Sequence, residues 1–307
     1  MKKIRLNNTN EVIYYEKLDN GLDVYMCPKD NCESFYLTYN IKFGSMDTLV
    51  KVANEKKKVS FPQGTAHFLE HQLFQNENNK TAFEDFANLG STVNAYTSYK
   101  LTCYEVMGST KFKENLECLY KLVNTPIFQD KSIENEKKII TNEINMYDAS
   151  PLAMLTFGLE YNLNIYDKHK YSISGTVSDI DKITSKILYK AYDTFYSKEN
   201  SFMVIVGNFS HLEALGILKE IIKKYKNIIY KKYTIISRKE PLKVENKSTV
   251  KIMSVDKPKV NIAFKIDKRS LNKYSNLKIY LDMLLDIKFS NSSDFYEIVS
   301  LNHIIDD

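Results

Sequence analysis

Two histidines and a glutamate stand close together within residues 64–74. His67, Glu70 and His71 occur at offsets of three and four positions, so in a helix their side chains share one face. Histidines at positions i and i+4 can bind one tetrahedral zinc ion through ring nitrogens. Glu70 can then reach a water molecule in the open coordination position without being a ligand. This order, H-x-x-E-H, inverts the commoner H-E-x-x-H motif, and it predicts a hydrolytic zinc site.

An exposed polar helix face is the alternative interpretation of the same residues. Two observations disfavour it. The chain has only five histidines. In addition, apolar residues flank the motif and would form a core-facing stripe, namely Phe68, Leu69, Leu73 and Phe74. Short motifs do match by chance, but two histidines that frame a glutamate beside an apolar stripe favour a metal site.

A pair of acidic residues offers the further ligand that such a site needs. Glu136 and Glu143 are seven positions apart, in a segment between Asp130 and Pro151 whose apolar residues recur at helical spacing. Seven positions are close to two helical turns, so both carboxylates project from one face. One can bind the metal while the other holds a ligand in place. Without the histidine motif, an ordinary pair of surface carboxylates would be the preferred interpretation.

Four further stretches accompany these two motifs. They are Phe43-Gly-Ser-Met-Asp47, Gly90-Ser-Thr-Val-Asn94-Ala95-Tyr-Thr97, His169-Lys-Tyr-Ser-Ile-Ser-Gly175-Thr176 and Phe195-Tyr-Ser-Lys-Glu-Asn200-Ser-Phe-Met-Val-Ile-Val-Gly207. Together and in this order, the motifs resemble the pitrilysin/insulinase family of inverted-zincin metallopeptidases. Within that family the chain is similar to the shorter bacterial members related to mitochondrial processing peptidase. The resemblance covers the catalytic domain, from about residue 20 to residue 207.

The resemblance implies a role for each residue of the two motifs. His67, His71 and Glu143 correspond to zinc ligands, Glu70 to the general base, and Glu136 to the acid that supports the site. The implied activity is that of a zinc-dependent metalloendopeptidase, with Zn²⁺ as cofactor and peptides or small unfolded proteins as substrates. A small-molecule metallohydrolase on a related fold is an alternative, which the length of the cleft would decide.

The strand pattern at residues 91–98 concerns substrate binding. An edge strand beside a metal site can pair with an extended peptide through backbone hydrogen bonds. The family binds substrate in this way, and the resemblance points to Asn94 and Ala95 as substrate-binding residues. The alternative is an ordinary sheet strand with an asparagine near a turn.

The other elements indicate a layered α+β fold. Two short strand patterns, 11–17 and 22–27, are joined through Asn20-Gly21, a pair typical of tight hairpin turns. Residues 92–107 alternate as a strand pair or one long bent strand, and a buried strand is expected at 201–207. Helical patterns lie between them without strict alternation of strand and helix, which favours a sheet covered by helices.

Two domains are expected. Residues 1–232 form the predicted zinc peptidase domain, and residues 241–307 an incomplete second domain of the family's inactive type, with strands at 249–255 and 260–266 and a helix at about 274–286. Full family members carry a complete second domain with substrate-binding Arg and Tyr residues. We therefore expect a homo- or heterodimer with another family subunit. The alternative function is a non-catalytic or impaired partner subunit that binds peptide without cleaving it.

Composition excludes several classes of protein. The net charge is +5, but 43 basic and 38 acidic residues are scattered along the chain, unlike the clustered basic residues of nucleic-acid-binding proteins. No apolar run is long enough to span a bilayer, and the residues after Met1 contain no apolar export signal. The four cysteines show no C-x-x-C spacing. These features predict a cytoplasmic protein with reduced thiols and no nucleic-acid or membrane partner.

Overall fold

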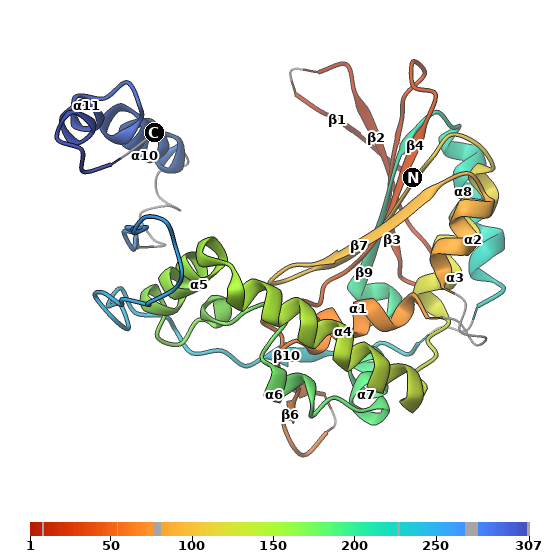
Figure 1. Ribbon diagram of the computed structural model, residues 1–307. Coiled ribbons are helices and arrows are strands. Elements are labelled where there is room, and N and C mark those ends of the chain that lie inside the picture. The colour runs from red at the N-terminus through yellow and green to blue at the C-terminus, as the bar shows by residue number, and fades with distance from the viewer. Residues whose placement is uncertain (8, 54, 76–80, 226–227, 268–275, 306–307) are drawn as a thin grey trace.

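The computed structural model describes residues 1–7, 9–53, 55–75, 81–225, 228–267 and 276–305 (Figure 1). Its centre is a seven-stranded sheet in the order β1-β2-β3-β9-β4-β8-β7. The strands are β1 (Lys2–Arg5), β2 (Val12–Lys17), β3 (Asp23–Pro28), β4 (Phe35–Ile41), β7 (Thr92–Thr97), β8 (Thr102–Gly108) and β9 (Ser201–Gly207). A second sheet joins β10 (Tyr233–Ile235), β5 (Leu49–Val52) and β6 (Val59–Ser60).

Strand β9 closes the middle of the large sheet. It runs parallel to β3 and antiparallel to β4, while all other neighbours in this sheet are antiparallel. The predicted hairpin at β2 and β3 is confirmed, and Gly21 adopts a φ of 92° in its turn, a left-handed conformation that suits glycine. The strand predicted at 201–207 and the strand pair within 92–107 are also confirmed.

Helices cover one face of the sheet (Figure 1). Those that contact the large sheet are α1 (Thr65–Leu73), α2 (Ala82–Asn88), α3 (Phe112–Asn124) and α8 (His211–Ile222). Helices α4 (Asp130–Ala149) and α7 (Ser185–Phe195) pack on α1, and α5 (Pro151–Leu163) and α6 (Val177–Ile180) pack on α4. Helix α3 packs on β4 and β8, and α1 packs against β7, α4 and α7. Short 3₁₀ turns lie at Lys168–Lys170 and Lys198–Asn200. The predicted layered α+β fold is therefore confirmed.

The core between sheet and helices is rich in aromatic side chains. Its largest fully buried aromatic side chains lie on five elements (α1, α2, α3, β4 and β8), just after β4 and at the end of α7. They are Tyr39, Phe43, Phe68, Phe86, Tyr104, Tyr120, Phe195 and Tyr196. Phe43 stacks on Phe195 with ring centroids 3.9 Å apart. The apolar stripe expected beside the histidine motif belongs to this core, so burial of that stripe fixes which face α1 turns away from the core.

The C-terminal region differs from the prediction. Within the described residues, neither 249–255 nor 260–266 forms a strand, and Val250 and Ile252 are 91% and 95% exposed. Both stretches have strand-like composition, but a strand exists only when a neighbouring strand pairs with it. No such neighbour occurs among the described residues, so the prediction of these two strands is wrong.

The predicted helix at about 274–286 corresponds to α10 (Leu277–Phe289), and residues 274–275 lie outside the described residues. Helix α11 (Asp294–Leu301) packs against α10, and Figure 1 draws the pair apart from the large sheet. The interval between the two predicted domains contains β10, which pairs with β5. The domain boundary itself stays a prediction. In the part of the chain that the structure describes, no helix is long and apolar enough to cross a membrane.

Candidate metal centre

Three of the predicted residues converge between α1 and α4. His67, His71 and Glu143 each offer one ligand atom, and these atoms all lie within 4.8 Å of one another. Nε2 of His67 is 3.8 Å from Oε1 of Glu143, and Nε2 of His71 is 4.0 Å from Oε2 of the same carboxylate. Donor atoms on one tetrahedral zinc ion lie roughly 3.3 Å apart. The three ligand atoms lie somewhat farther apart than this.

The start of α1 is held by a glycine contact. Gly64 has a φ of 79°, and a Cβ atom there would lie 2.3 Å from the carbonyl oxygen of Ser174, so a larger residue would push these two segments apart. The close approach brings the side chain of Ser174 beside α4, where its Oγ is 3.5 Å from Oε1 of Glu143. The motif Gly175-Thr176 thus packs on the N-terminus of the helix that carries both histidines.

Glu136 orients His71. Oε1 of Glu136 lies 2.8 Å from Nδ1 of His71, and Oε2 accepts a hydrogen bond from Nε2 of Gln75 at 3.4 Å. Glu136 is only 4% exposed. An ionised carboxylate can only accept, so Nδ1 carries the hydrogen and Nε2 is left to face Glu143. Burial lowers the pKa of His71, but the hydrogen bond and charge of Glu136 outweigh burial, and the net pKa is raised.

His67 is in a different environment. Burial lowers its pKa to about 3, and the nearby His71 acts in the same direction. His67 is therefore neutral at pH 7, the form in which an imidazole binds metal. Its Nδ1 is buried and has no hydrogen-bond partner among the described residues. The two histidines of the motif are thus held by different means: a carboxylate contacts Nδ1 of His71, whereas His67 is held by burial and by contact with the ring of His71.

Glu70 lies beside the group formed by His67, His71 and Glu143 but is not one of its members. Its side chain is buried, 6% exposed, and its Oε2 accepts a hydrogen bond from Oγ1 of Thr97 at 2.6 Å. Burial raises the pKa of Glu70, while the hydrogen bond from Thr97 acts in the opposite direction. A desolvated carboxylate next to a metal group is chemically suited to accept a proton. The motif spacing predicted this position of Glu70, whereas its partner Thr97 was not predicted.

Strand β7 forms one edge of the large sheet. Among the described residues it pairs with β8 on one side and with no strand on the other. Asn94 is exposed and Ala95 is partly exposed. The last residue of β7, Thr97, contacts α1 through its hydrogen bond to Glu70. The structure therefore brings the two predicted substrate-binding residues to an open sheet edge close to the histidines.

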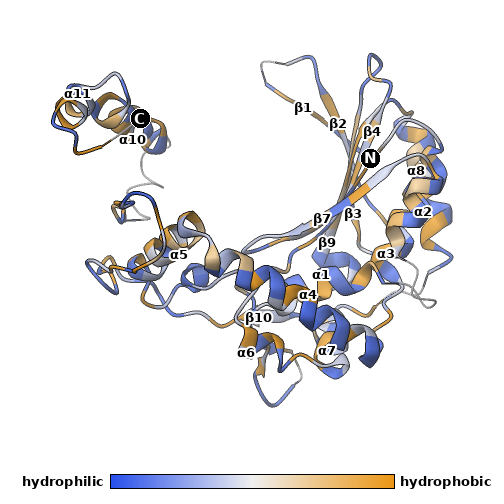
Figure 2. Ribbon diagram, viewed as in Figure 1, coloured by the Kyte–Doolittle hydropathy of each residue, from blue (hydrophilic) through white to orange (hydrophobic). Residues whose placement is uncertain are grey.

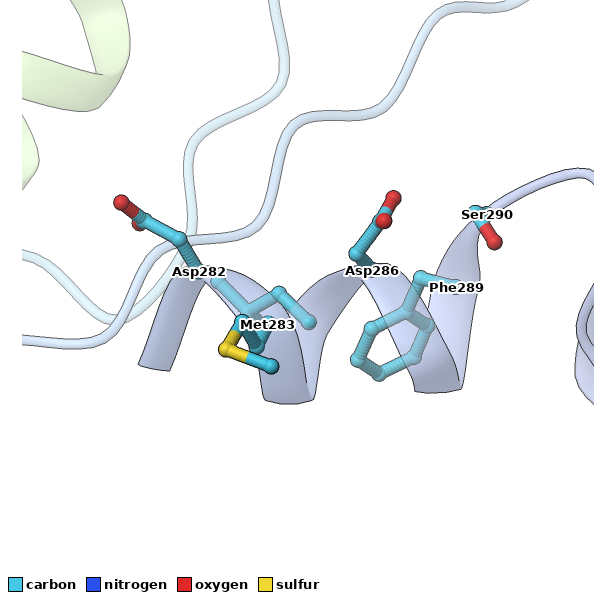
Figure 3. Close-up of a pocket in the computed structure, with 6 residues that line it drawn as sticks. Asp282, Met283, Asp286, Phe289 and Ser290 are labelled. Carbon is cyan, nitrogen blue, oxygen red and sulfur yellow. The ribbon is translucent and has the colours of Figure 1, made fainter. Parts of the chain in front are cut away.

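Size alone does not identify the site. A hollow of about 630 Å³ lies along α10, where Asp282 and Asp286 project from one side of the helix and Met283 and Phe289 from the other (Figure 3). All its lining residues come from this helix and from Ser290, which follows its last residue, so it is an exposed groove. A smaller cavity of about 150 Å³ lies between α4, α5 and residues 172–177, and none of His67, His71 and Glu143 is among its lining residues.

Comparisons with known proteins agree with the motifs. The family model described as "Insulinase (Peptidase family M16)" matches residues 53–176, and the model described as "Peptidase M16 inactive domain" matches residues 182–302. The chain is 34% identical to the Bacillus subtilis protein YmfH, which is named a zinc protease, over 100% of this chain and 72% of that protein. Its matches to some other curated relatives span about half of their length, with 46% and 50% as examples.

Solved structures show the same fold. An M16-like peptidase from Alicyclobacillus acidocaldarius superposes with a TM-score of 0.84 and 26% identity, over 98% of this chain and 70% of that chain. The first half of the periplasmic protease PqqL from Escherichia coli superposes with a TM-score of 0.60 and 23% identity, over 74% of this chain and 49% of that chain. The predicted cytoplasmic location stays a prediction. The resemblance inferred from the motifs is confirmed: the chain belongs to the insulinase family of peptidases, family M16.

Proposed function

We propose that the chain is a zinc-dependent endopeptidase that hydrolyses peptides or small unfolded proteins bound as an extended strand. The observation that supports it most is the convergence of His67, His71 and Glu143 within 4.8 Å, next to the buried carboxylate of Glu70. Two imidazoles and a carboxylate are the ligand set of catalytic zinc sites in several peptidases. A group that served only as scaffold would have no need of all four residues.

Each residue has a defined task in this reaction. His67, His71 and Glu143 would hold the ion, and Glu136 would keep the ring of His71 turned toward it through the contact at Nδ1. When bound, zinc lowers the pKa of water and polarises the scissile carbonyl. Glu70 would accept the proton of the attacking water and transfer it to the leaving amine.

The open edge of β7 is the proposed substrate-binding element. Its free backbone groups near Asn94 and Ala95 can pair with an extended peptide, which gives affinity for many sequences. A peptide added at this edge would pass the end of the strand, where Thr97 contacts Glu70. This arrangement favours extended or unfolded substrates over folded proteins and over small molecules.

A partner subunit is a second candidate role, alone or combined with catalysis. Figure 2 shows hydrophobic stretches along α10 and α11. Apolar side chains of these helices are exposed to solvent, among them Ile287 at 67% and Leu301 at 72%. Surfaces of this kind commonly mark protein contacts. The activity, substrates and partners of the proteins that this chain resembles are proposals for this chain, because the matches span only part of several of them.

The test is cleavage of a fluorogenic peptide library and of an unfolded protein by the purified chain, before and after removal of metal with a chelator. We expect cleavage that the chelator abolishes and that added zinc restores. Cleavage that survives complete removal of metal would contradict the proposal. If the zinc-loaded chain binds these peptides without cleaving them, the partner-subunit role is supported instead.

A further inference from the structure

Thr97 is a buried residue whose hydroxyl contacts α1, the helix that carries His67, Glu70 and His71. It ends β7, and the burial along this strand alternates, so that Val93 and Thr97 face the helices while Thr92, Asn94 and Tyr96 are exposed. Its Oγ1 donates to Oε2 of Glu70 at 2.6 Å, and both side chains are less than a tenth exposed. A short hydrogen bond to a carboxylate in a buried setting is among the stronger side-chain contacts.

This contact determines what Glu70 can do. The terminal torsion of a glutamate side chain is broad, so an untethered carboxylate samples many orientations. With Oε2 engaged by Thr97, the carboxylate has fewer orientations open to it, and Oε1 is left to accept a proton. General-base catalysis depends on such placement, because the base must lie within hydrogen-bond reach of the proton that it removes.

We propose that Thr97 is a positioning residue that fixes the Glu70 carboxylate and links it to the strand at which substrate binds. The inference rests on the proposed peptidase function and deepens it. Asn94 and Thr97 belong to one six-residue strand, so the element that receives the peptide also holds the base in place. Substrate alignment and base alignment are then set by the same strand.

If the Thr97 hydroxyl only stabilised the fold, removing it should affect kcat no more than removing another buried hydroxyl of the sheet. The neighbouring strand β8 provides such a hydroxyl as the matched control. Thr102 is paired with Thr97 in the β7–β8 register and is fully buried. Its hydroxyl donates to the backbone oxygen of Phe43 at 2.9 Å. Thr102→Val therefore removes a buried hydroxyl from the adjacent sheet position without touching Glu70.

The first arm of the experiment is kinetic. Thr97→Val is expected to lower kcat by about tenfold to a hundredfold, the typical effect of a slightly misplaced catalytic group, while KM and zinc content stay close to those of the wild type. Thr97→Ser keeps the donor and should restore most of kcat, and Thr102→Val should leave kcat within about twofold. Full kcat in Thr97→Val, or equal losses in Thr97→Val and Thr102→Val, would overturn the inference.

The second arm needs neither metal nor activity. In metal-free protein, the unfolding midpoints of Thr97→Val, Glu70→Ala and the double variant form a double-mutant cycle. The contact predicts that Thr97→Val lowers the midpoint clearly in the wild type and little once Glu70 is removed. Additive effects would overturn the inference. If the wild type cleaves no peptide, the proposed function fails on its own, and this cycle then decides whether Thr97 holds Glu70.

Discussion

Nδ1 of His71 lies 2.8 Å from Oε1 of Glu136, on the side of the imidazole ring away from Glu143. The bond fixes the tautomer and the orientation of the ring, so Nε2 faces Glu143, within the group of ligand atoms that could hold a metal ion. His67 has no comparable partner for its Nδ1 among the described residues. The orientation of one histidine therefore depends on a carboxylate that is itself not in the ligand group.

Glu136→Gln should weaken zinc binding. The amide keeps the shape of the side chain but loses the charge that favours the Nδ1–H form of His71. Loss of such a supporting partner typically costs about tenfold to a hundredfold in metal affinity. Zinc affinity can be measured by competition with a chromophoric chelator. Glu134→Gln on the same helix, whose side chain is 65% exposed, is the matched control and should bind zinc like the wild type.

Glu70→Gln should separate the base from the ligands. The variant retains the size of the side chain and an oxygen that can accept from Thr97, but it cannot take a proton. We expect zinc to stay bound and peptide hydrolysis to fall by about two to four orders of magnitude. Both are measured on one preparation, by elemental analysis and by a fluorogenic assay. Loss of zinc in this variant would show that Glu70 is a ligand, contrary to the assigned role.

A buried lysine makes stability depend on pH. Lys198 is 1% exposed, its Nζ donates to Oδ1 of Asn124, and it lies 5.5 Å from the ring centre of Tyr120. Burial lowers its pKa from 10.5 to about 8, and the charge of Glu199 opposes this only partly. Between about pH 8 and pH 10.5 the unfolded chain keeps a proton on Lys198 that the folded chain has released. The free energy of unfolding should therefore rise with pH across this window, and below about pH 8 it should lack this contribution.

Lys198→Met should remove this effect. At pH 7 the variant is expected to be more stable by up to about 3 kcal/mol, given roughly 1.4 kcal/mol per pKa unit, less the hydrogen bond lost to Asn124. Its stability should change less between pH 8 and pH 10.5. Urea unfolding at several pH values measures both effects. Lys182→Met, at a side chain that is 63% exposed, should leave both unchanged, and destabilisation by Lys198→Met would contradict the account.

Glu240 holds the C-terminal segment to the end of α5. Its carboxylate accepts hydrogen bonds from the backbone N–H groups of Ile165, Tyr166 and Asp167, and it pairs with Lys265. Burial raises the pKa of Glu240, but these partners outweigh burial and lower the pKa to about 2. In Glu240→Gln, we expect hydrogen exchange at residues 165–167 to accelerate by about tenfold to a hundredfold, the usual worth of hydrogen bonds to a charged group.

The control for this prediction is Glu245→Gln. Glu245 lies on the same segment, and the bond that ties it to Asn162 comes from its backbone N–H, which the substitution keeps. Exchange at residues 165–167 should match the wild type in this control. Equal exchange in the wild type and in Glu240→Gln would mean that the carboxylate does not hold the segment.

Local patterns predicted much of the site, because the spacing of His67, Glu70 and His71 is a property of one helix. The spacing of Glu136 and Glu143 is likewise local to α4. What the sequence could not supply was how separate segments meet. The insertion of β9 between β3 and β4, the small sheet of β5, β6 and β10, and the bond from Thr97 to Glu70 all join segments that are distant in sequence.

The predicted strands at 249–255 and 260–266 failed for the same reason. Alternation of apolar residues records which face a strand would bury, but not whether a neighbouring strand is present. Thr97 is the last residue of the stretch 90–97 that resembles the family, so the sequence marked its neighbourhood. Its contact with Glu70 could not be predicted, because it depends on how the fold places the end of β7 against α1.

Zinc content of the wild type and of His71→Ala tests the central claim most directly. Each protein is dialysed against metal-free buffer and measured by elemental analysis. His211→Ala is the control, because His211 stacks on Tyr14 and is not one of the ligand residues. We predict about one zinc ion per chain in the wild type and in His211→Ala, and almost none in His71→Ala, because a site with three protein ligands cannot hold the ion well after losing one. Stoichiometric zinc in His71→Ala, or none in the wild type after exposure to zinc, would contradict the account.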